Sequence, residues 1–130
     1  MLKKIATIAL LLPLTFATAH AKSTPTAQEQ KIFTGCSLLS YLSYQAMTNY
    51  QNGLSQSQNN TQLNQQFAQT FNQTFGQGSS DKLIGRTLQV VYEQPKGNTN
   101  QEKEDLSKTF ALGTLQGCAD ETGLDLNKFN

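Results

Sequence analysis

The sequence predicts an all-α protein, a small four-helix bundle-like domain in which one disulfide joins the first and last helices. Four segments repeat apolar residues at steps of three and four, which is the pattern of amphipathic helices. Polar connections separate these segments, and two cysteines stand near the two ends of the helical region. Because each helix has one apolar stripe to bury, a bundle is the arrangement that buries all four together.

The start of the chain has the pattern of a signal peptide, which we expect to cover residues 1–21. A basic start is followed by a mostly apolar run over residues 5–14 and by a small-x-small cleavage sequence that ends at Ala21. The apolar run is too short to span a bilayer, which takes about 20 residues. We therefore expect a single helical domain of residues 22–130 without a stable membrane anchor, located in a bacterial periplasm or outside the cell.

The charge balance argues against a nucleic-acid-binding protein. The whole sequence has a net charge of +1, and removal of the signal peptide with its two lysines leaves eight Lys and Arg residues against nine Asp and Glu residues. Such a domain lacks the basic field that neutralises phosphates or binds an anionic membrane surface.

The first expected helix covers residues 27–52, and Gly53 follows it as a candidate C-terminal cap. Residues 54–60 are rich in Ser, Gln and Asn and predict a polar connection. Tyr41 and Tyr44 lie off the main apolar stripe of this helix, so they are candidates for an exposed recognition patch.

The second expected helix, residues 61–76, has an unusual apolar stripe. Phe67, Phe71 and Phe75 stand four residues apart, and nearly everything between them is Gln, Asn or Thr. One interpretation is that the stripe is the contribution of this helix to the core. The other is an exposed face for a partner protein or a lipid, because large aromatic side chains dominate the energetics of interfaces.

The third expected helix covers residues 80–94. Ser79 or Ser80 is its candidate N-cap, and Pro95 ends it because the residue before a proline is biased away from the helical region. The β-branched and aromatic residues within 88–92 leave a short strand as the alternative there.

The fourth expected helix covers residues 101–122. Thr99 and Glu102 form a Thr-x-x-Glu capping box at its start, and Gly123 is the candidate C-cap. The residues of the following tail that can pack on the domain are Leu126 and Phe129.

The two cysteines, Cys36 and Cys118, predict a structural disulfide between the first and fourth helices, because an exported domain folds in an oxidising compartment. A redox pair usually shows Cys-x-x-Cys spacing, and a metal site needs further Cys or His ligands. Gly113 and Gly117 precede Cys118 and would allow the close approach of another helix that such a bridge requires.

The residue types argue against an enzyme and against a bound cofactor or metal. The only histidine, His20, lies in the expected signal peptide, so the mature chain would lack the commonest general base near neutral pH and the Ser-His and Cys-His pairs. Residues 76–78 have no lysine at the position that a phosphate loop needs. The acids at residues 102–105 stand at a helix start, where the helix dipole and capping explain them, and those at 120–125 lack EF-hand spacing.

The chain resembles a group of small exported proteobacterial proteins with two cysteines and no assigned activity. The positions that carry the resemblance are Cys36, Ala46–Met47, Gln51–Gly53, Tyr92–Pro95 and Cys118. The resemblance implies the helical fold and the disulfide, and it supplies no site. In size and architecture the chain is also similar to small two-cysteine periplasmic immunity proteins that neutralise cell-wall amidases, which is an analogy of fold alone.

These observations predict a non-catalytic periplasmic protein-binding module, whose partner is another protein such as a toxin or an envelope enzyme that it inhibits. The candidate partner-binding residues are Tyr41, Tyr44, Phe67, Phe71 and Phe75. The alternative function is a periplasmic carrier or envelope-stress chaperone that binds apolar ligands or unfolded chains.

Overall fold

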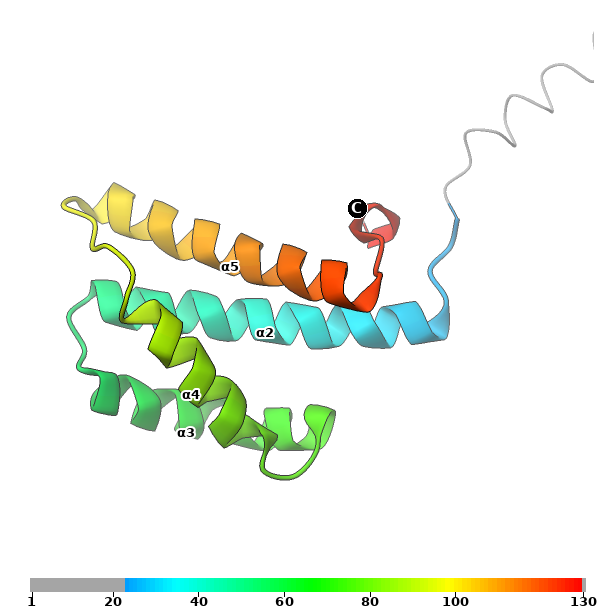
Figure 1. Ribbon diagram of the computed structural model, residues 1–130, viewed down its shortest axis with the longest axis horizontal. Coiled ribbons are helices and arrows are strands. Elements are labelled where there is room, and N and C mark those ends of the chain that lie inside the picture. The colour runs from blue at the N-terminus through cyan, green and yellow to red at the C-terminus, as the bar shows by residue number, and fades with distance from the viewer. Residues whose placement is uncertain (1–22, 130) are drawn as a thin grey trace, which may run out of the picture.

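The computed structural model describes residues 23–129, which form four α-helices and one short 3₁₀ helix (Figure 1). The helices are α2 (Ala27–Gln51), α3 (Gln56–Phe75), α4 (Ser79–Val91), α5 (Asn100–Thr122) and η1 (Leu126–Phe129). The predicted signal peptide lies outside the described residues. There is no strand within residues 23–129, so the all-α prediction is confirmed and the alternative strand at 88–92 is wrong.

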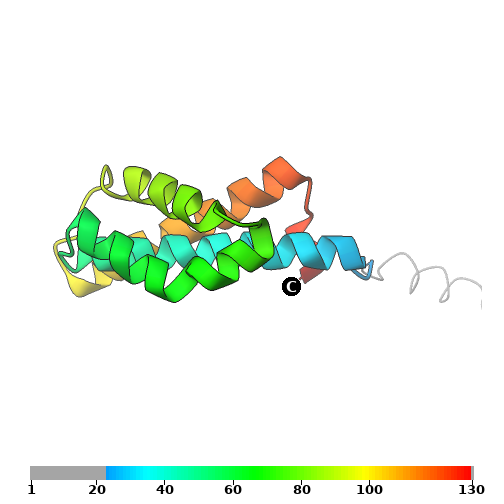
Figure 2. The same ribbon diagram turned by 90° about the horizontal axis from the view of Figure 1, so that it is seen from below.

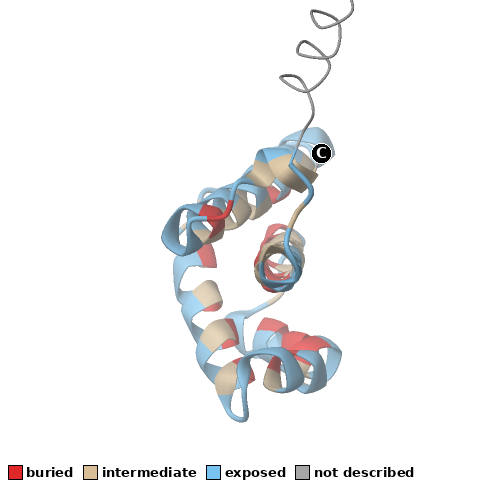
Figure 3. Ribbon diagram, turned by 90° about the vertical axis from the view of Figure 1, so that its right-hand side faces the viewer, coloured by how far each residue is buried: buried red, intermediate tan, exposed pale blue. Residues whose placement is uncertain are grey.

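α2 is the central helix of the molecule. α5 packs along one side of α2, whereas α3 and α4 pair with each other and pack on its other side (Figure 3). Figure 2 shows α3 and α4 covering the C-terminal half of α2. α4 and α5 are consecutive in the chain but make only minor contact, so the bundle is open between them.

The hydrophobic core lies between α2, α3 and α4. Its buried side chains are Leu42, Ala46, Met47, Tyr50, Leu63, Phe67, Phe71, Ile84, Leu88 and Val91. The core interpretation of the phenylalanine stripe therefore holds for Phe67 and Phe71, whose rings pack edge to face with their centroids 5.5 Å apart. α5 contributes less to this core, because Leu106 and Phe110 pack against it while remaining only partly buried.

The predicted disulfide joins α2 to α5. The Cα atoms of Cys36 and Cys118 lie 5.6 Å apart, within the range that such a bridge needs. The sequence predicts that Gly113 and Gly117 allow the close approach of α2 beside the disulfide, and this prediction is wrong. A Cβ atom built on either glycine would meet no atom within 4 Å beyond its immediate helix backbone, so both glycines face open space rather than α2.

Polar contacts supplement the disulfide between α2 and α5. Ser40 Oγ donates a hydrogen bond to the Ala111 carbonyl at 2.7 Å. Thr114 Oγ1 donates to Ser43 Oγ at 2.8 Å, where Ser43 is buried. α5 is therefore held on α2 by a covalent bridge and by specific hydrogen bonds in addition to its packing along α2.

α2 and α5 begin with the capping boxes that their sequences contain. Thr99 Oγ1 accepts a hydrogen bond from the Glu102 N–H at 3.1 Å, as predicted. Thr26 Oγ1 accepts the corresponding bond from the Glu29 N–H at 3.1 Å. Gly123 ends α5 with φ of 72°, the left-handed conformation that favours glycine at a C-cap.

α3 begins at Gln56 rather than at residue 61, so the predicted polar connection over residues 54–60 is wrong for most of its length. Ser55 is the N-cap: its Oγ accepts the Gln58 N–H at 3.2 Å, and Gln58 Oε1 accepts the Ser55 N–H at 3.1 Å. This capping box starts a helix in a segment whose composition alone indicates a loop.

α4 begins at a different N-cap from the one that its sequence suggests. The N-cap is Gly78, with φ of 84° and no side-chain bond, and neither Ser79 nor Ser80 takes that place. Asn72 of α3 supplies the missing acceptor, since its Oδ1 accepts the Ser80 N–H at 3.2 Å. α4 then ends at Val91, before the expected residue 94.

The side chains of Gln51 and Tyr92 hold the loops at the end of α2. Gln51 Nε2 donates to the Pro95 carbonyl at 2.9 Å, and the Gly97 N–H donates to Gln51 Oε1 at 2.9 Å. The Tyr92 hydroxyl donates to the Leu54 carbonyl at 2.7 Å. These bonds fix the loop that connects α4 to α5.

The tail packs on the start of α2, as predicted for Phe129. Its ring stacks on that of Phe33 with the centroids 4.2 Å apart. Lys128 Nζ lies 2.9 Å from Glu29 Oε2. The hydrogen bond from Lys128 is the largest reason why the pKa of the Glu29 carboxyl is lowered from its ordinary value.

Candidate functional site

A groove of about 720 Å³ lies between α4 and α5. α2 supplies its floor through Ser43 and Met47, while Val90 of α4 and Leu106 and Phe110 of α5 line its walls. Because α4 and α5 make only minor contact, no described segment covers this lining, and the groove is open to solvent. This wall-and-floor arrangement, which we call the α4–α5 groove, is the candidate site.

The apolar lining of the groove follows from the way in which α4 packs. α4 buries Ile84, Leu88 and Val91 in the core. Val90 lies outside this buried stripe and is 48% exposed, so its side chain belongs to the groove rather than to the core. An exposed valine and two partly buried apolar residues of α5 together form an apolar surface. A ligand that covers this surface removes it from water, which lowers the free energy.

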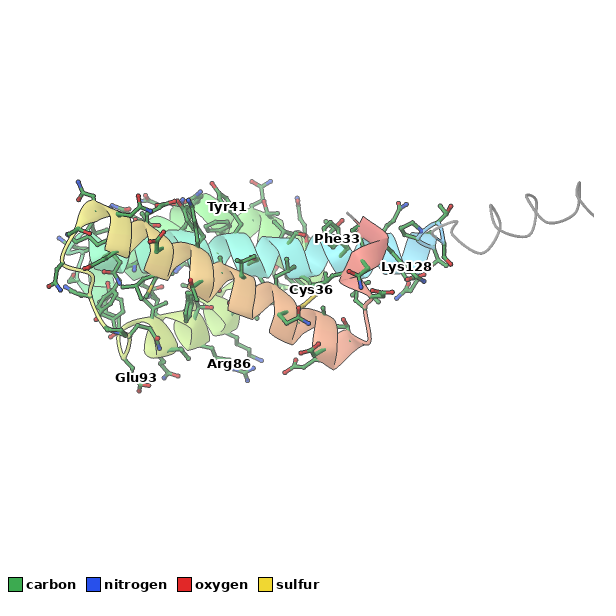
Figure 4. All side chains as sticks on the ribbon, turned by 90° about the horizontal axis from the view of Figure 1, so that it is seen from above. Phe33, Cys36, Tyr41, Arg86, Glu93 and Lys128 are labelled. Carbon is green, nitrogen blue, oxygen red and sulfur yellow. A yellow bond between two sulfur atoms is a disulfide. The ribbon has the colours of Figure 1, made fainter. Side chains whose placement is uncertain are left out.

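The two sides of the groove carry opposite charges. Arg86, the only arginine of the sequence, lines the groove from α4, and Glu121 lines it from α5. Figure 4 shows Arg86 extending from α4 into solvent. The ion pairs found within residues 23–129 involve other residues, so neither charge is neutralised by a close partner there.

A second hollow, of about 470 Å³, lies on the other flank of α5 against α2. It brings together the two tyrosines that the sequence singled out, Tyr41 and Tyr44, with Leu112 of α5. Tyr41 is 49% exposed and Leu112 is 64% exposed, whereas Tyr44 is partly buried. These two tyrosines therefore share one surface, and only Tyr41 offers it a largely exposed ring.

The Tyr44 hydroxyl is already engaged within the molecule. It donates to Glu104 Oε1 at 2.8 Å, which joins α2 to the start of α5. The hydrogen bond to the Glu104 carboxylate, followed by burial, raises the pKa of Tyr44 above its ordinary value of 10.0. Tyr44 therefore serves as a neutral donor that positions α5.

The three phenylalanines of the predicted binding stripe occupy two environments. Phe67 and Phe71 are buried in the core, so this conformation does not present them to a partner. Phe75 is 39% exposed, and its ring covers Gly35 near the disulfide. The stripe as a whole is not a continuous surface, and it does not reach the α4–α5 groove.

The described residues contain neither a cluster of metal-ligating side chains nor a helix that could span a membrane. Within residues 23–129, no three His, Cys, Asp or Glu side chains gather closely enough to hold a metal ion. No helix of the same region combines the length and the apolar character needed to cross a bilayer.

Sequence reasoning missed the α4–α5 groove and selected the core phenylalanines instead. The available signal was the pair of Arg86 and Val90, which stand four positions apart on α4 and so lie on one face, away from the buried stripe. The sequence also points to Gly113, but it predicts a contact with α2 that the structure does not contain.

Comparison of the chain with protein-family models, with curated proteins and with solved structures found no match.

Proposed function

We propose that this protein is a non-catalytic protein-binding module of the cell envelope and that it binds its partner in the α4–α5 groove. The observation that carries the proposal is the separation of α4 from α5 over an apolar floor and walls. A partner that covers Val90 and Phe110 would remove apolar surface from water, and this supplies the driving force for binding.

The way in which α5 is held supports binding rather than collapse of the groove. The disulfide fixes α5 to α2 near one end, and the hydrogen bond from Tyr44 to Glu104 fixes it near the other. The Gln51 bonds also restrain the loop that leads into α5. A groove whose walls are fixed in the free protein loses little conformational entropy when a partner binds.

An inhibitor or immunity function is the specific form of this proposal. It is supported by the small size of the domain and by its disulfide-braced helical architecture, which is similar to that of periplasmic immunity proteins. In this form the partner is an envelope-acting enzyme. The periplasmic or extracellular location is part of the same proposal and is supported by the disulfide, a bond typical of oxidising compartments.

Site-specific photo-cross-linking tests the proposal. A photoreactive amino acid would replace Val90, which lines the groove, and Gln89 would carry the matched control, because it is an exposed neighbour on the same helix that does not line the groove. The oxidised protein would be irradiated in periplasmic extract. We expect a discrete protein adduct at position 90 and not at position 89. Recovery of no protein adduct at position 90 would contradict a protein-binding groove.

A carrier for an apolar ligand with an acidic headgroup is the second candidate function, and the dimensions of the groove favour it. Its volume of about 720 Å³ lies in the usual range of small-molecule sites, roughly 300–1,000 Å³. Arg86 would bind the acidic group while Met47 and Phe110 contact the apolar part. Mass spectrometry of the position-90 adduct distinguishes the two candidates, because a carrier would yield a low-molecular-weight adduct.

A further inference from the structure

We infer that the occupant of the α4–α5 groove is a single amphipathic α-helix of the partner, with an acidic side chain toward Arg86 and a basic side chain toward Glu121. This inference rests on the proposed protein-binding function and specifies the partner's structure. Three observations carry it: the backbone chemistry of the groove, the open α5 wall and the opposite charges of the two sides.

The backbone chemistry excludes an extended peptide that would add to a sheet edge. The floor and both walls are α-helices, and the N–H and C=O groups in the interior of a helix bond to each other. An occupant therefore finds no sheet edge with which to pair. A helix satisfies its own backbone hydrogen bonds while it buries one apolar face, so it suits a groove that offers no backbone partners.

The α5 wall has the length and the surface that a helix requires. It lines the groove continuously from Leu106 to Thr114, about 12 Å or roughly two helical turns at 1.5 Å per residue, and Glu121 lines it again about two turns further along α5. Gly113 lies in this wall, and a Cβ atom at that position would meet no atom within 4 Å beyond its immediate helix backbone. The backbone of α5 is therefore open to close approach by a second helix, while Phe110, one turn before Gly113, offers an aromatic contact.

The charges then define the flanks of the partner helix. Arg86 lies on the α4 side and Glu121 on the α5 side, and neither belongs to an ion pair found within residues 23–129. A helix with acidic residues on one flank and basic residues on the other would complement both sides at once. A helix with one kind of charge on both flanks would be repelled by one side, so the groove discriminates between them.

Designed peptides test this inference with the mature, oxidised protein. The first probe is an 18-residue amphipathic helix with a Leu and Ala stripe, Glu on one flank and Lys on the other. The second probe has Lys on both flanks, and the third is the first with a central proline that breaks the helix. We expect the first probe to bind at least about tenfold more tightly than the other two, measured by calorimetric titration.

Variants of the protein locate the binding. Gly113→Leu would fill the groove, and Gly85→Leu is the matched control, because Gly85 is also a helical glycine with open space around it but does not line the groove. Both variants are expected to keep or raise Tm, since leucine favours helix over glycine. Only Gly113→Leu should weaken binding of the first probe, by about tenfold or more, and amide shifts of Val90 and Gly113 should map the complex.

The outcomes separate this inference from the proposed function. Binding of the proline-containing peptide as tightly as the first, binding unaffected by Gly113→Leu, or no binding of any probe would overturn the helical occupant. If one of these results came with a protein adduct at position 90, the binding function would stand and its partner would not be a helix. Failure to form the adduct would count against the function itself.

Discussion

Asn59 shows what a single buried polar residue does in this molecule. Its side chain has no exposed surface and is fully engaged: Nδ2 donates to the Ala46 carbonyl at 2.9 Å and to the Tyr92 hydroxyl at 3.3 Å, and Oδ1 accepts from Asn49 Nδ2 at 3.0 Å. One amide therefore links α2, α3 and the end of α4. With these partners in place, the buried amide favours one packing of the three helices. Loss of the amide would remove a hydrogen bond from each of its partners.

Replacement of this amide is expected to be costly. Asn59→Ala should lower the free energy of unfolding by about 2–3 kcal/mol, because it removes three hydrogen bonds and leaves a cavity at a fully buried position. Urea denaturation monitored by circular dichroism measures this change. Gln62→Ala, at an exposed position of the same helix, is the control and should change stability by less than about 0.5 kcal/mol. Equal effects of the two substitutions would contradict the role given to Asn59.

Tyr44 leads to a prediction about alkaline pH. Its pKa is raised in the folded protein, first by the hydrogen bond to Glu104 and then by burial. The unfolded chain therefore loses this proton at a lower pH than the folded chain does. The contribution of Tyr44 to stability should be complete below pH 10 and should decline as the pH rises through the higher, folded pKa.

The variant Tyr44→Phe isolates this effect from the titration of other groups. The difference in free energy of unfolding between the natural protein and Tyr44→Phe should be constant from pH 7 to about pH 9 and should shrink above about pH 10. Denaturant titrations at each pH measure it. A difference that grew with pH would mean that the hydroxyl is not held as a donor to Glu104.

At the scale of the elements, the loop between α4 and α5 packs closely against the first turn of α5. Gly97 lies so close to the first turn of α5 that a Cβ atom would be 2.7 Å from the Lys103 nitrogen and 2.9 Å from the Glu102 carbonyl carbon. Both are backbone atoms, which cannot move aside as a flexible side chain can. The loop therefore needs a residue without a side chain at this point.

The substitution Gly97→Ala should consequently destabilise the protein by about 1–3 kcal/mol, because it forces the loop away from α5. Gly85→Ala is the matched control and should stabilise α4 by up to about 1 kcal/mol, since this helical glycine has open space around it. Thermal unfolding of both variants checks the prediction through opposite changes in Tm. A rise in Tm for Gly97→Ala would show that the loop is not packed as described.

The elements also show which local signals can be read from a sequence. The α5 capping box was predictable because Thr99 and Glu102 are three residues apart and act on each other. The α3 start was predictable in principle from Ser55 and Gln58, but the Ser, Gln and Asn composition suggested a loop. The α4 cap could not be predicted in this way, because its acceptor, Asn72, belongs to another helix.

At the scale of the whole molecule, the disulfide reinforces a helix that contacts the rest of the protein mainly through α2. Among the α5 residues only Ser107 and Ala119 are buried, so this helix gains little from the hydrophobic core. The bridge between Cys36 and Cys118 closes a loop of 82 positions and restricts the unfolded chain. It therefore reinforces the one helix whose packing on the molecule depends mainly on α2.

Removal of the bridge should thus affect the helices unequally. The double variant Cys36→Ser and Cys118→Ser is expected to lose about 2–4 kcal/mol of stability. Hydrogen exchange measured by mass spectrometry should show the largest loss of protection in α5, and smaller changes in α3 and α4, which pair with each other. Equal loss of protection in all four helices would show that α5 is no less stable than the rest.

The sequence by itself determined the helical class, the extent of α2 and α5 and the disulfide pair, because these depend on the spacing of residues within one helix and on residue types. It left open whether the phenylalanine stripe was core or surface, and packing decided this in favour of the core for Phe67 and Phe71. Only the tertiary structure decided that α4 and α5 stay apart and that Gly113 faces a groove. The reason is physical: the angle at which helices cross is set jointly by side chains from several elements, and no single segment contains that information.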